Sequence, residues 1–287
     1  MNIFNFFRRK TPQEPEPTDA LSYLTRHYSN SDEEGRLLTR HGQVEYRTTM
    51  RYIERYLAPG MRVLEVGAGT GRYSLTLARQ GHDITAIELV QHNIDLFRQK
   101  LKPEDNIDLQ QGNALDLSRF ADNSFDITLL LGPMYHLYTR EDQLKALNEA
   151  LRVTKPGGVL FAAYVLADMA MLASGIAPKT WFWDYLENGM IDPTTYICKP
   201  KPSELFVLYR REDILALAAE LPAERLHYVA VNCASHLLKD TLANMTDEQF
   251  EIFMRYHNFL CERPDMAGMA SHALDILRKE KNIEFTP

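Results

Sequence analysis

Long apolar segments are missing from this sequence of 287 residues. The longest apolar run extends over residues 159–167 and ends at Asp168, whereas a membrane-spanning helix requires about 20 consecutive apolar residues. The N-terminal residues 1–10 place aromatic side chains before a basic cluster, the reverse of the order found in a secretory signal. We therefore expect no membrane span and a cytoplasmic protein.

Cysteine is also scarce, and basic residues are fewer than acidic ones. The three cysteines, Cys198, Cys233 and Cys261, are odd in number and far apart, which is typical of free or buried thiols in a reducing compartment. No pair of cysteine or histidine residues has zinc spacing, so we expect no metal. The net charge of −7 argues against a broad, non-specific hold on nucleic acid.

One stretch combines a strand pattern, a glycine-rich turn and a helix pattern. Residues 63–66 are apolar and of strand type, glycines follow at positions 67, 69 and 71, and the helix pattern stops at Gly81. A second strand pattern at 84–87 ends on Glu88. In such a unit the glycines let the backbone approach a nucleotide. An acid about 20 residues after the first glycine accepts hydrogen bonds from the ribose hydroxyls.

The glycine spacing distinguishes between classes of nucleotide. A dinucleotide fingerprint, G-x-G-x-x-G, requires its third glycine at position 72, which is Arg72. Glu65 precedes the turn, and a carboxylate there opposes the diphosphate that a helix N-terminus otherwise favours. The pattern instead suits a ligand that carries a cationic amino group.

The stretch from Glu65 to Gly71 resembles motif I of the class I S-adenosylmethionine-dependent methyltransferases. Residues 151–158 resemble the turn before strand five of that family, and the resemblance covers residues 44–166 in detail. It implies a Rossmann-like α/β fold with a seven-stranded, mostly parallel sheet, helices on both faces and a cap insertion. It also implies S-adenosyl-L-methionine as the donor, S-adenosyl-L-homocysteine as the product, and no metal.

The resemblance also assigns a cofactor site to successive strand ends. Strand patterns at 107–110 and 125–131 are followed by Asn113 and by Gly132. In similar methyltransferases an Asp-Ala or Asn-Ala pair binds adenine, the side chain accepting from the amino group. The implied cofactor-binding residues are Glu65, Gly67, Ala68, Gly69, Gly71, Glu88, Leu89, Asn113, Ala114, Leu131 and Gly132.

The hexapeptide at residues 132–137, Gly-Pro-Met-Tyr-His-Leu, lies where ligands bind in open α/β sheets. It resembles a bacterial subgroup of methyltransferases that is assigned to small-molecule acceptors. His136 is the candidate general base because its ordinary pKa of about 6.5 suits neutral pH, although it could equally pack against a turn. Tyr135 and Tyr164 are candidates to place an aromatic face beside the sulfonium.

The remaining chain divides into segments around this core. Proline and glutamate alternate near the N-terminus, which predicts a disordered tail at 1–17. Residues 166–205 form an insertion with clustered aromatics, which either stack on an acceptor or make a small core of their own. We predict a helical lid at 18–60, a cofactor-binding core at 61–165, the cap at 166–205, and completion of the sheet by 206–287.

Two details of these segments stay open in the sequence. In the lid, Arg36, Arg40, His41 or Arg47 could meet the cofactor's carboxylate or simply be solvated. Residues 272–278 are read as a final antiparallel strand because the fold requires one, with a short helix as the alternative.

The leading hypothesis is a methyltransferase that acts on a small molecule by direct in-line displacement. The alternatives keep the fold: methylation of RNA or protein, or a nucleoside-binding protein without turnover. A nicotinamide dehydrogenase is disfavoured by Arg72 and Glu65. The acceptor and the oligomeric state are not determined by the sequence.

Overall fold

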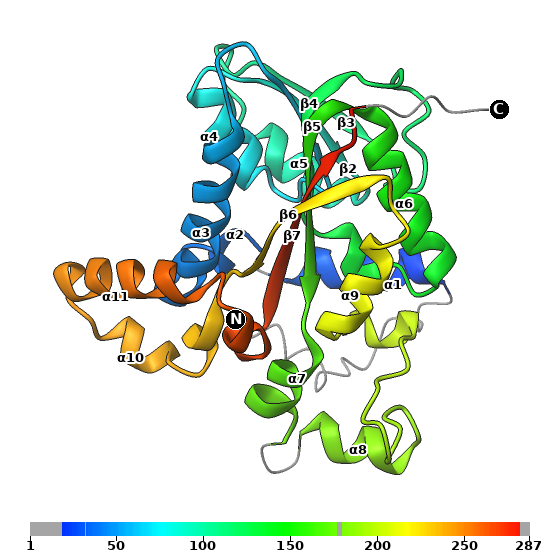
Figure 1. Cartoon of the computed structure of the whole chain (residues 1–287), viewed down its shortest axis with the longest axis vertical. Coiled ribbons are helices and arrows are strands. Elements are labelled where there is room, and N and C mark those ends of the chain that lie inside the picture. The colour runs from blue at the N-terminus through cyan, green and yellow to red at the C-terminus, as the bar shows by residue number, and fades with distance from the viewer. Residues whose placement is uncertain (1–18, 32, 177–179, 282–287) are drawn as a thin grey trace.

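The computed structural model describes residues 19–31, 33–176 and 180–281, so the tail expected at 1–17 lies outside the described residues. Seven strands form one sheet in the order β3-β2-β1-β4-β5-β7-β6 (Figure 1). The strands are β1 (Arg62–Val66), β2 (Asp83–Glu88), β3 (Ile107–Gln111), β4 (Phe125–Leu130), β5 (Thr154–Val165), β6 (Ala223–Ala230) and β7 (His272–Lys279).

Helices cover both faces of this sheet, with α3 and α4 on one side and α6 and α9 on the other (Figure 1). The α-helices are α1 (Ala20–Asn30), α2 (Glu33–Arg36), α3 (Arg40–Tyr56), α4 (Arg72–Arg79), α5 (Gln91–Arg98), α6 (Arg140–Val153), α7 (Ala167–Ala170), α8 (Trp181–Glu187), α9 (Arg211–Ala218), α10 (Lys239–Ala243) and α11 (Asp247–Leu260). A π-helical turn, η3 (Met171–Gly175), and the short 3-10 helices η2 (Pro133–His136), η4 (Pro202–Glu204), η5 (Cys233–His236) and η6 (Pro264–Met269) complete the description. In the described part of the chain, no helix has the length and apolar character needed to cross a membrane.

The predicted fold class is confirmed, including the orientation of the last strand. Strands β1 to β5 pair in parallel, and β7 inserts antiparallel between β5 and β6. Val165 pairs with His272 and Val159 with Arg278, so the alternative of a short helix at this position is wrong. A strand satisfies the backbone groups of β5 and β6 together, which a helix placed there would leave unpaired.

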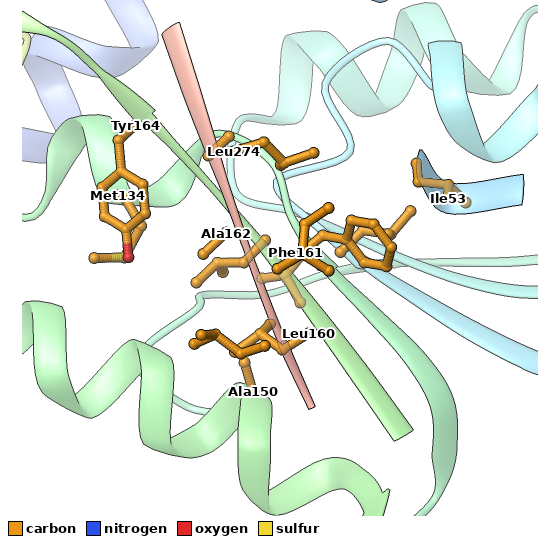
Figure 2. Close-up of a cluster of buried hydrophobic side chains, with 14 of the residues drawn as sticks. Ile53, Met134, Ala150, Leu160, Phe161, Ala162, Tyr164 and Leu274 are labelled. Atoms are coloured by element: carbon orange, nitrogen blue, oxygen red, sulfur yellow. The ribbon is translucent and has the colours of Figure 1, made fainter. Parts of the chain in front are cut away.

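Strand β5, which lies between β4 and β7, contributes to the hydrophobic core on both of its faces. Its side chains alternate between the two faces, as a strand period of two requires. Figure 2 shows Phe161 directed toward Ile53 of α3 and Leu160 toward Ala150 of α6. All four side chains are fully buried, so each face of β5 is sealed by one helix.

The segment at 166–205 makes a small core of its own. Trp181 and Phe182 of α8 are buried against Ala170, Met171 and Ile191, and α7 and α8 lie beyond the end of β5 (Figure 1). Of the two readings of its aromatic cluster, the structure supports internal packing. Burial of apolar area among Trp181, Phe182 and Tyr185 stabilises this core, whereas Trp183 is 51% exposed.

Candidate functional site

A cavity of about 360 Å³ opens at the carboxyl ends of β1, β2, β3 and β4. Ten of the eleven predicted cofactor residues line it, together with Tyr135 and His136. The exception is Gly71, which is the N-cap of α4 and lies beneath the loop. In the described chain, no residue of 166–205 lines this cavity; one wall comes instead from α1, through Ala20, Leu21, Leu24 and Tyr28.

The glycine loop after β1 leaves room for a ligand at one position. Gly69 and Gly71 both have positive φ, 55° and 85°, a region that glycine enters at little cost. A Cβ on Gly71 would lie 2.4 Å from the Phe97 ring, whereas a Cβ on Gly69 would meet nothing within 4 Å. The open space over Gly69 therefore belongs to the cavity, and the close contact at Gly71 fixes the loop from below.

Glu65 connects the loop to α4. The N-cap of α4 is Gly71, which has no side chain to cap the helix, and Oε2 of Glu65 accepts hydrogen bonds from the Ser74 amide at 2.9 Å and from its hydroxyl. Burial and, to a smaller extent, the nearby Glu88 raise the pKa of Glu65 to about 8, although the hydrogen bonds from Ser74 oppose the shift. The carboxyl group thus lines the cavity in a position where a cationic ligand group would favour its ionised form.

Glu88 ends β2 and is held by three donors. Its Oε2 accepts from the Gly69 amide at 2.7 Å, and its Oε1 accepts from the Val90 amide at 2.9 Å and from Asn93 Nδ2 at 3.3 Å. Burial raises the pKa of Glu88, and these hydrogen bonds oppose that shift. The carboxylate is therefore fixed between the glycine loop and the start of α5, with an edge on the cavity.

Asn113 follows β3 and folds back on its own turn. Its Oδ1 accepts from the Leu115 amide at 3.0 Å, while the adjacent Ala114 is buried. An amide oxygen has a second lone pair. The side chain can therefore hold the turn and still accept from a ligand amino group.

Of the four basic residues that could meet a carboxylate or simply be solvated, Arg36 alone lines the cavity among the described residues, and it pairs with Glu45 at 3.0 Å. Arg40 and Arg47 form ion pairs with residues of α11, and the His41 ring contacts Thr39. These three residues are therefore occupied outside the cavity.

Arg72, which stands where a dinucleotide fingerprint would have its third glycine, also lines the cavity. Its guanidinium lies 4.8 Å from the centre of the Tyr46 ring. Its Nε is buried and has no hydrogen-bond partner within the described chain. A buried donor without a partner costs about 1–3 kcal/mol, and the residue lines the cavity, so an anionic ligand group would relieve that cost. The only feature of the sequence that could have identified Arg72 as a site residue is its position in place of the third glycine.

His136 and Tyr135 lie on η2, directly after β4. His136 Nε2 is 2.8 Å from the Tyr28 hydroxyl and Nδ1 is 2.9 Å from the Leu205 carbonyl oxygen, and burial lowers the pKa of His136 to about 4. Tyr135 lines the cavity. Tyr164, expected beside the sulfonium, is instead buried with its ring 5.0 Å from that of Tyr209 and does not line the cavity. It lies on β5 itself, where its side chain fills the core.

Tyr28 was not singled out from the sequence. It lies on α1 and contacts a residue 108 positions later in the chain, and no local motif surrounds it. Long-range contacts of this kind have no signature in spacing or periodicity, so only the structure places Tyr28 in the site.

Residues 64–162 match the family model described as a methyltransferase domain. Among curated proteins, the chain is 42% identical over 106 residues to a demethylmenaquinone methyltransferase of Renibacterium salmoninarum, covering 37% of this chain and 41% of that protein. It is 29% identical over 161 residues to a ubiquinone biosynthesis O-methyltransferase of Xanthomonas campestris pv. campestris, covering 56% of this chain and 65% of that protein. The chain thus spans 41% to 65% of the lengths of these two relatives.

Among solved structures, a protein of Methanosarcina mazei described as a SAM-dependent methyltransferase superposes with a TM-score of 0.54 at 18% identity, over 80% of this chain and 98% of that one. At this identity the likeness concerns the fold. Residues 64–162 thus match a methyltransferase domain, and the chain has the Rossmann-like fold of the solved structure.

Proposed function

We propose that this protein transfers a methyl group from S-adenosylmethionine to a small-molecule acceptor by direct in-line displacement. The methyltransferase domain at residues 64–162 supports the reaction class. The observation that carries the proposal is the chemistry of the cavity wall. Acids at the ends of β1 and β2, open space over Gly69 and an unsatisfied Arg72 Nε meet in one cavity.

These groups fit the parts of S-adenosylmethionine one by one. Glu88 suits the ribose hydroxyls, because a fixed carboxylate makes charge-assisted hydrogen bonds. Glu65 suits the cationic amino group, and Arg72, with Arg36 beside the cavity, suits the carboxylate. Asn113 and Ala114 would hold the adenine from the turn after β3.

S-adenosylmethionine supplies an electrophilic methyl group whose sulfur keeps the electron pair of the broken bond. The protein's contribution is to hold the acceptor about 3 Å from that methyl group and to exclude water. Tyrosine rings supply aromatic faces toward a cationic centre, an interaction of about 0.5–2 kcal/mol. Those that line the cavity are Tyr28, Tyr73, Tyr135 and Tyr138.

A small acceptor is supported by the shape of the site and by the relatives. Helix α1 forms a wall of the cavity and packs against α5 and η4, as a lid at 18–60 would. The named relatives are methyltransferases of quinone biosynthesis. An RNA acceptor would need a broad basic surface, and the net charge is −7.

Calorimetric titration tests this proposal. We expect S-adenosylhomocysteine to bind with micromolar affinity and NADH to give no heat. Two ribose bonds of about 1.5–3 kcal/mol each predict that Glu88→Ala weakens binding by about 10²-fold or more. The exposed Glu104→Ala is the matched control and should bind as the wild type does. Binding of NADH in place of S-adenosylhomocysteine would refute the proposal.

A further inference from the structure

We propose that Tyr28 of α1 is a catalytic residue that takes the proton of a phenolic acceptor while passing its own proton to His136. The inference rests on the proposed methyl transfer and names the class of acceptor: a phenol, on an apolar body. It changes the role expected of His136, which becomes the terminal proton acceptor rather than the group that contacts the acceptor.

The hydrogen-bond pattern fixes the direction of each bond. The Leu205 carbonyl oxygen can only accept, so the Nδ1 atom of His136, 2.9 Å away, carries the ring proton. In a neutral imidazole the other nitrogen then has a lone pair. The Tyr28 hydroxyl, 2.8 Å from Nε2, is therefore the donor in that bond. A phenol that donates still has lone pairs with which its oxygen accepts.

The Leu205 carbonyl is held in place by an unusual backbone. Leu205 is fully buried and has φ of 68° and ψ of −47°, a sparsely populated positive-φ conformation that costs a leucine about 1–3 kcal/mol. The same carbonyl oxygen accepts from the Tyr138 hydroxyl at 2.9 Å. The following segment is tied to η2, since the Val207 amide donates to the Tyr135 carbonyl at 2.7 Å. Leu205 is thus a positioning residue that sets the tautomer of His136.

Both ring nitrogens of His136 are engaged, and the ring packs against Phe206 with centroids 5.3 Å apart. Tyr28 lies at Nε2 and lines the cavity. Because the Tyr28 hydroxyl occupies Nε2, a proton from the cavity can reach that nitrogen through the Tyr28 oxygen.

The proton transfers balance the reaction. The acceptor oxygen uses a lone pair to bond the methyl carbon while its O–H bond breaks. That proton moves to the Tyr28 oxygen, and the Tyr28 proton moves to Nε2 of His136, forming an imidazolium whose Nδ1–H still donates to Leu205. One positive charge is lost from the donor's sulfur and one appears on His136, so the cavity keeps its net charge. The lowered pKa of His136 then favours release of the proton to solvent.

The neighbours of Tyr28 on α1 define the acceptor's body. Leu21 and Leu24 lie on the same face of the helix and line the cavity, as do Leu37 and Leu137. Such a wall favours an aromatic or aliphatic body by burial of apolar area. Tyr28 is the polar side chain that α1 contributes to this wall. A single polar group on the wall suits an acceptor that carries a single hydroxyl.

The first measurement needs no turnover. Histidine-selective ¹⁵N NMR on the full-length protein should show that His136 is a neutral Nδ1–H imidazole whose Nε2 is hydrogen-bonded. Tyr28→Phe keeps the ring and removes the donor, so the Nε2 resonance should shift, and His136→Gln should delete and thereby assign it. Tyr23→Phe is the control, because it makes the same change on the same helix without lining the cavity.

The second measurement separates catalysis from structure. At about pH 8, phenol keeps its proton, whereas 4-nitrophenol is largely ionised. With labelled donor, Tyr28→Phe should slow methylation of phenol by about 10²-fold or more, the range of general base catalysis. Methylation of 4-nitrophenol should fall less than about fivefold, because no proton has to move. His136→Gln should show the same selective loss.

Each outcome decides something. Equal losses on the two phenols, or no loss on either, would overturn the relay, as would an Nε2 resonance unmoved by Tyr28→Phe. A wild type that binds S-adenosylhomocysteine but methylates neither phenol would overturn the phenolic acceptor and leave the proposed function standing. No binding of S-adenosylhomocysteine would instead remove the proposed function itself.

Discussion

At the scale of single residues, Glu65 illustrates how the site is built into the fold. Its carboxyl group caps α4 through Ser74 and also lines the cavity. The cap stabilises the helix, whereas burying the charge costs free energy, and the raised pKa of about 8 shows that burial is the larger effect. The protein thus holds, beside its ligand site, a carboxyl group whose ionised form is destabilised by burial.

This conflict predicts a pH dependence of stability. The pKa of Glu65 is about 8 in the folded protein and about 4.3 in an unfolded chain. Between these values the folded state binds more protons, so the free energy of unfolding should fall as pH rises from about 5 to 8. Glu65→Gln still accepts from Ser74 but cannot ionise, so its stability relative to the wild type should rise over that interval by about 1–3 kcal/mol.

Urea unfolding of the ligand-free protein at several pH values checks this prediction. Glu88 and Asp275 also have raised pKa values and add slopes of the same sign. The informative quantity is therefore the difference between variant and wild type. A difference that stays constant from pH 5 to pH 8 would contradict the assignment.

At the scale of elements, local patterns and long-range contacts differ in what the sequence reveals. The strand-turn-helix unit that carries Gly69 and Glu88 was predictable, because its glycines, its acid and its helix stop lie within one continuous stretch. The wall formed by α1 was not, because the contact of Tyr28 with His136 joins residues 108 positions apart. For the same reason the sequence left open whether the aromatics of the insertion stack on an acceptor or on each other, and the structure packs Trp181 and Phe182 into a small core.

The glycine loop gives a prediction at this scale. Gly69 and Gly81 both have positive φ, 55° and 94°, with open space around a built Cβ. Alanine at either position should cost about 1–2 kcal/mol of stability from backbone strain. Only Gly69 lines the cavity, so Gly69→Ala should weaken binding of S-adenosylhomocysteine more than tenfold, while Gly81→Ala should bind it normally.

Urea unfolding and calorimetry on the two variants supply both numbers. Gly71→Ala completes the series, because its Cβ would collide with Phe97. It should destabilise the protein more than either of the others. Normal binding by Gly69→Ala would mean that the loop does not approach the ligand.

At the scale of the whole molecule, the strand β7, last in the sequence, completes the sheet by joining β6 to β5. That β7 exists was predictable only from the needs of the fold, since its sequence allowed a helix as well. Its insertion between β5 and β6 brings Asp275 to a fully buried position. There Arg225 of β6 binds it through two hydrogen bonds, Nε to Oδ1 at 2.6 Å and Nη2 to Oδ2 at 3.0 Å.

The ion pair between Arg225 and the buried Asp275 predicts how the free energy of unfolding depends on the contact between β6 and β7. Arg225→Met leaves a buried carboxyl without its partner, which costs about 3–5 kcal/mol. Burial already raises the pKa of Asp275 and Arg225 opposes that shift, so without Arg225 the carboxyl should take up a proton more readily. The loss should therefore be larger at pH 8 than at pH 5. Adding Asp275→Leu removes the orphaned group, so the double variant should recover most of the stability.

The neighbouring pair of Arg278 and Glu224 provides the control. Its charges lie 3.7 Å apart and are largely exposed, so Arg278→Met should change the free energy of unfolding by less than about 1 kcal/mol. A double-mutant cycle on urea unfolding measures the coupling between Arg225 and Asp275. If the losses of stability in the two single variants simply add in the double variant, the ion pair does not join β6 to β7. In that case the two strands are held together by the backbone hydrogen bonds and the apolar side chains of β7 alone.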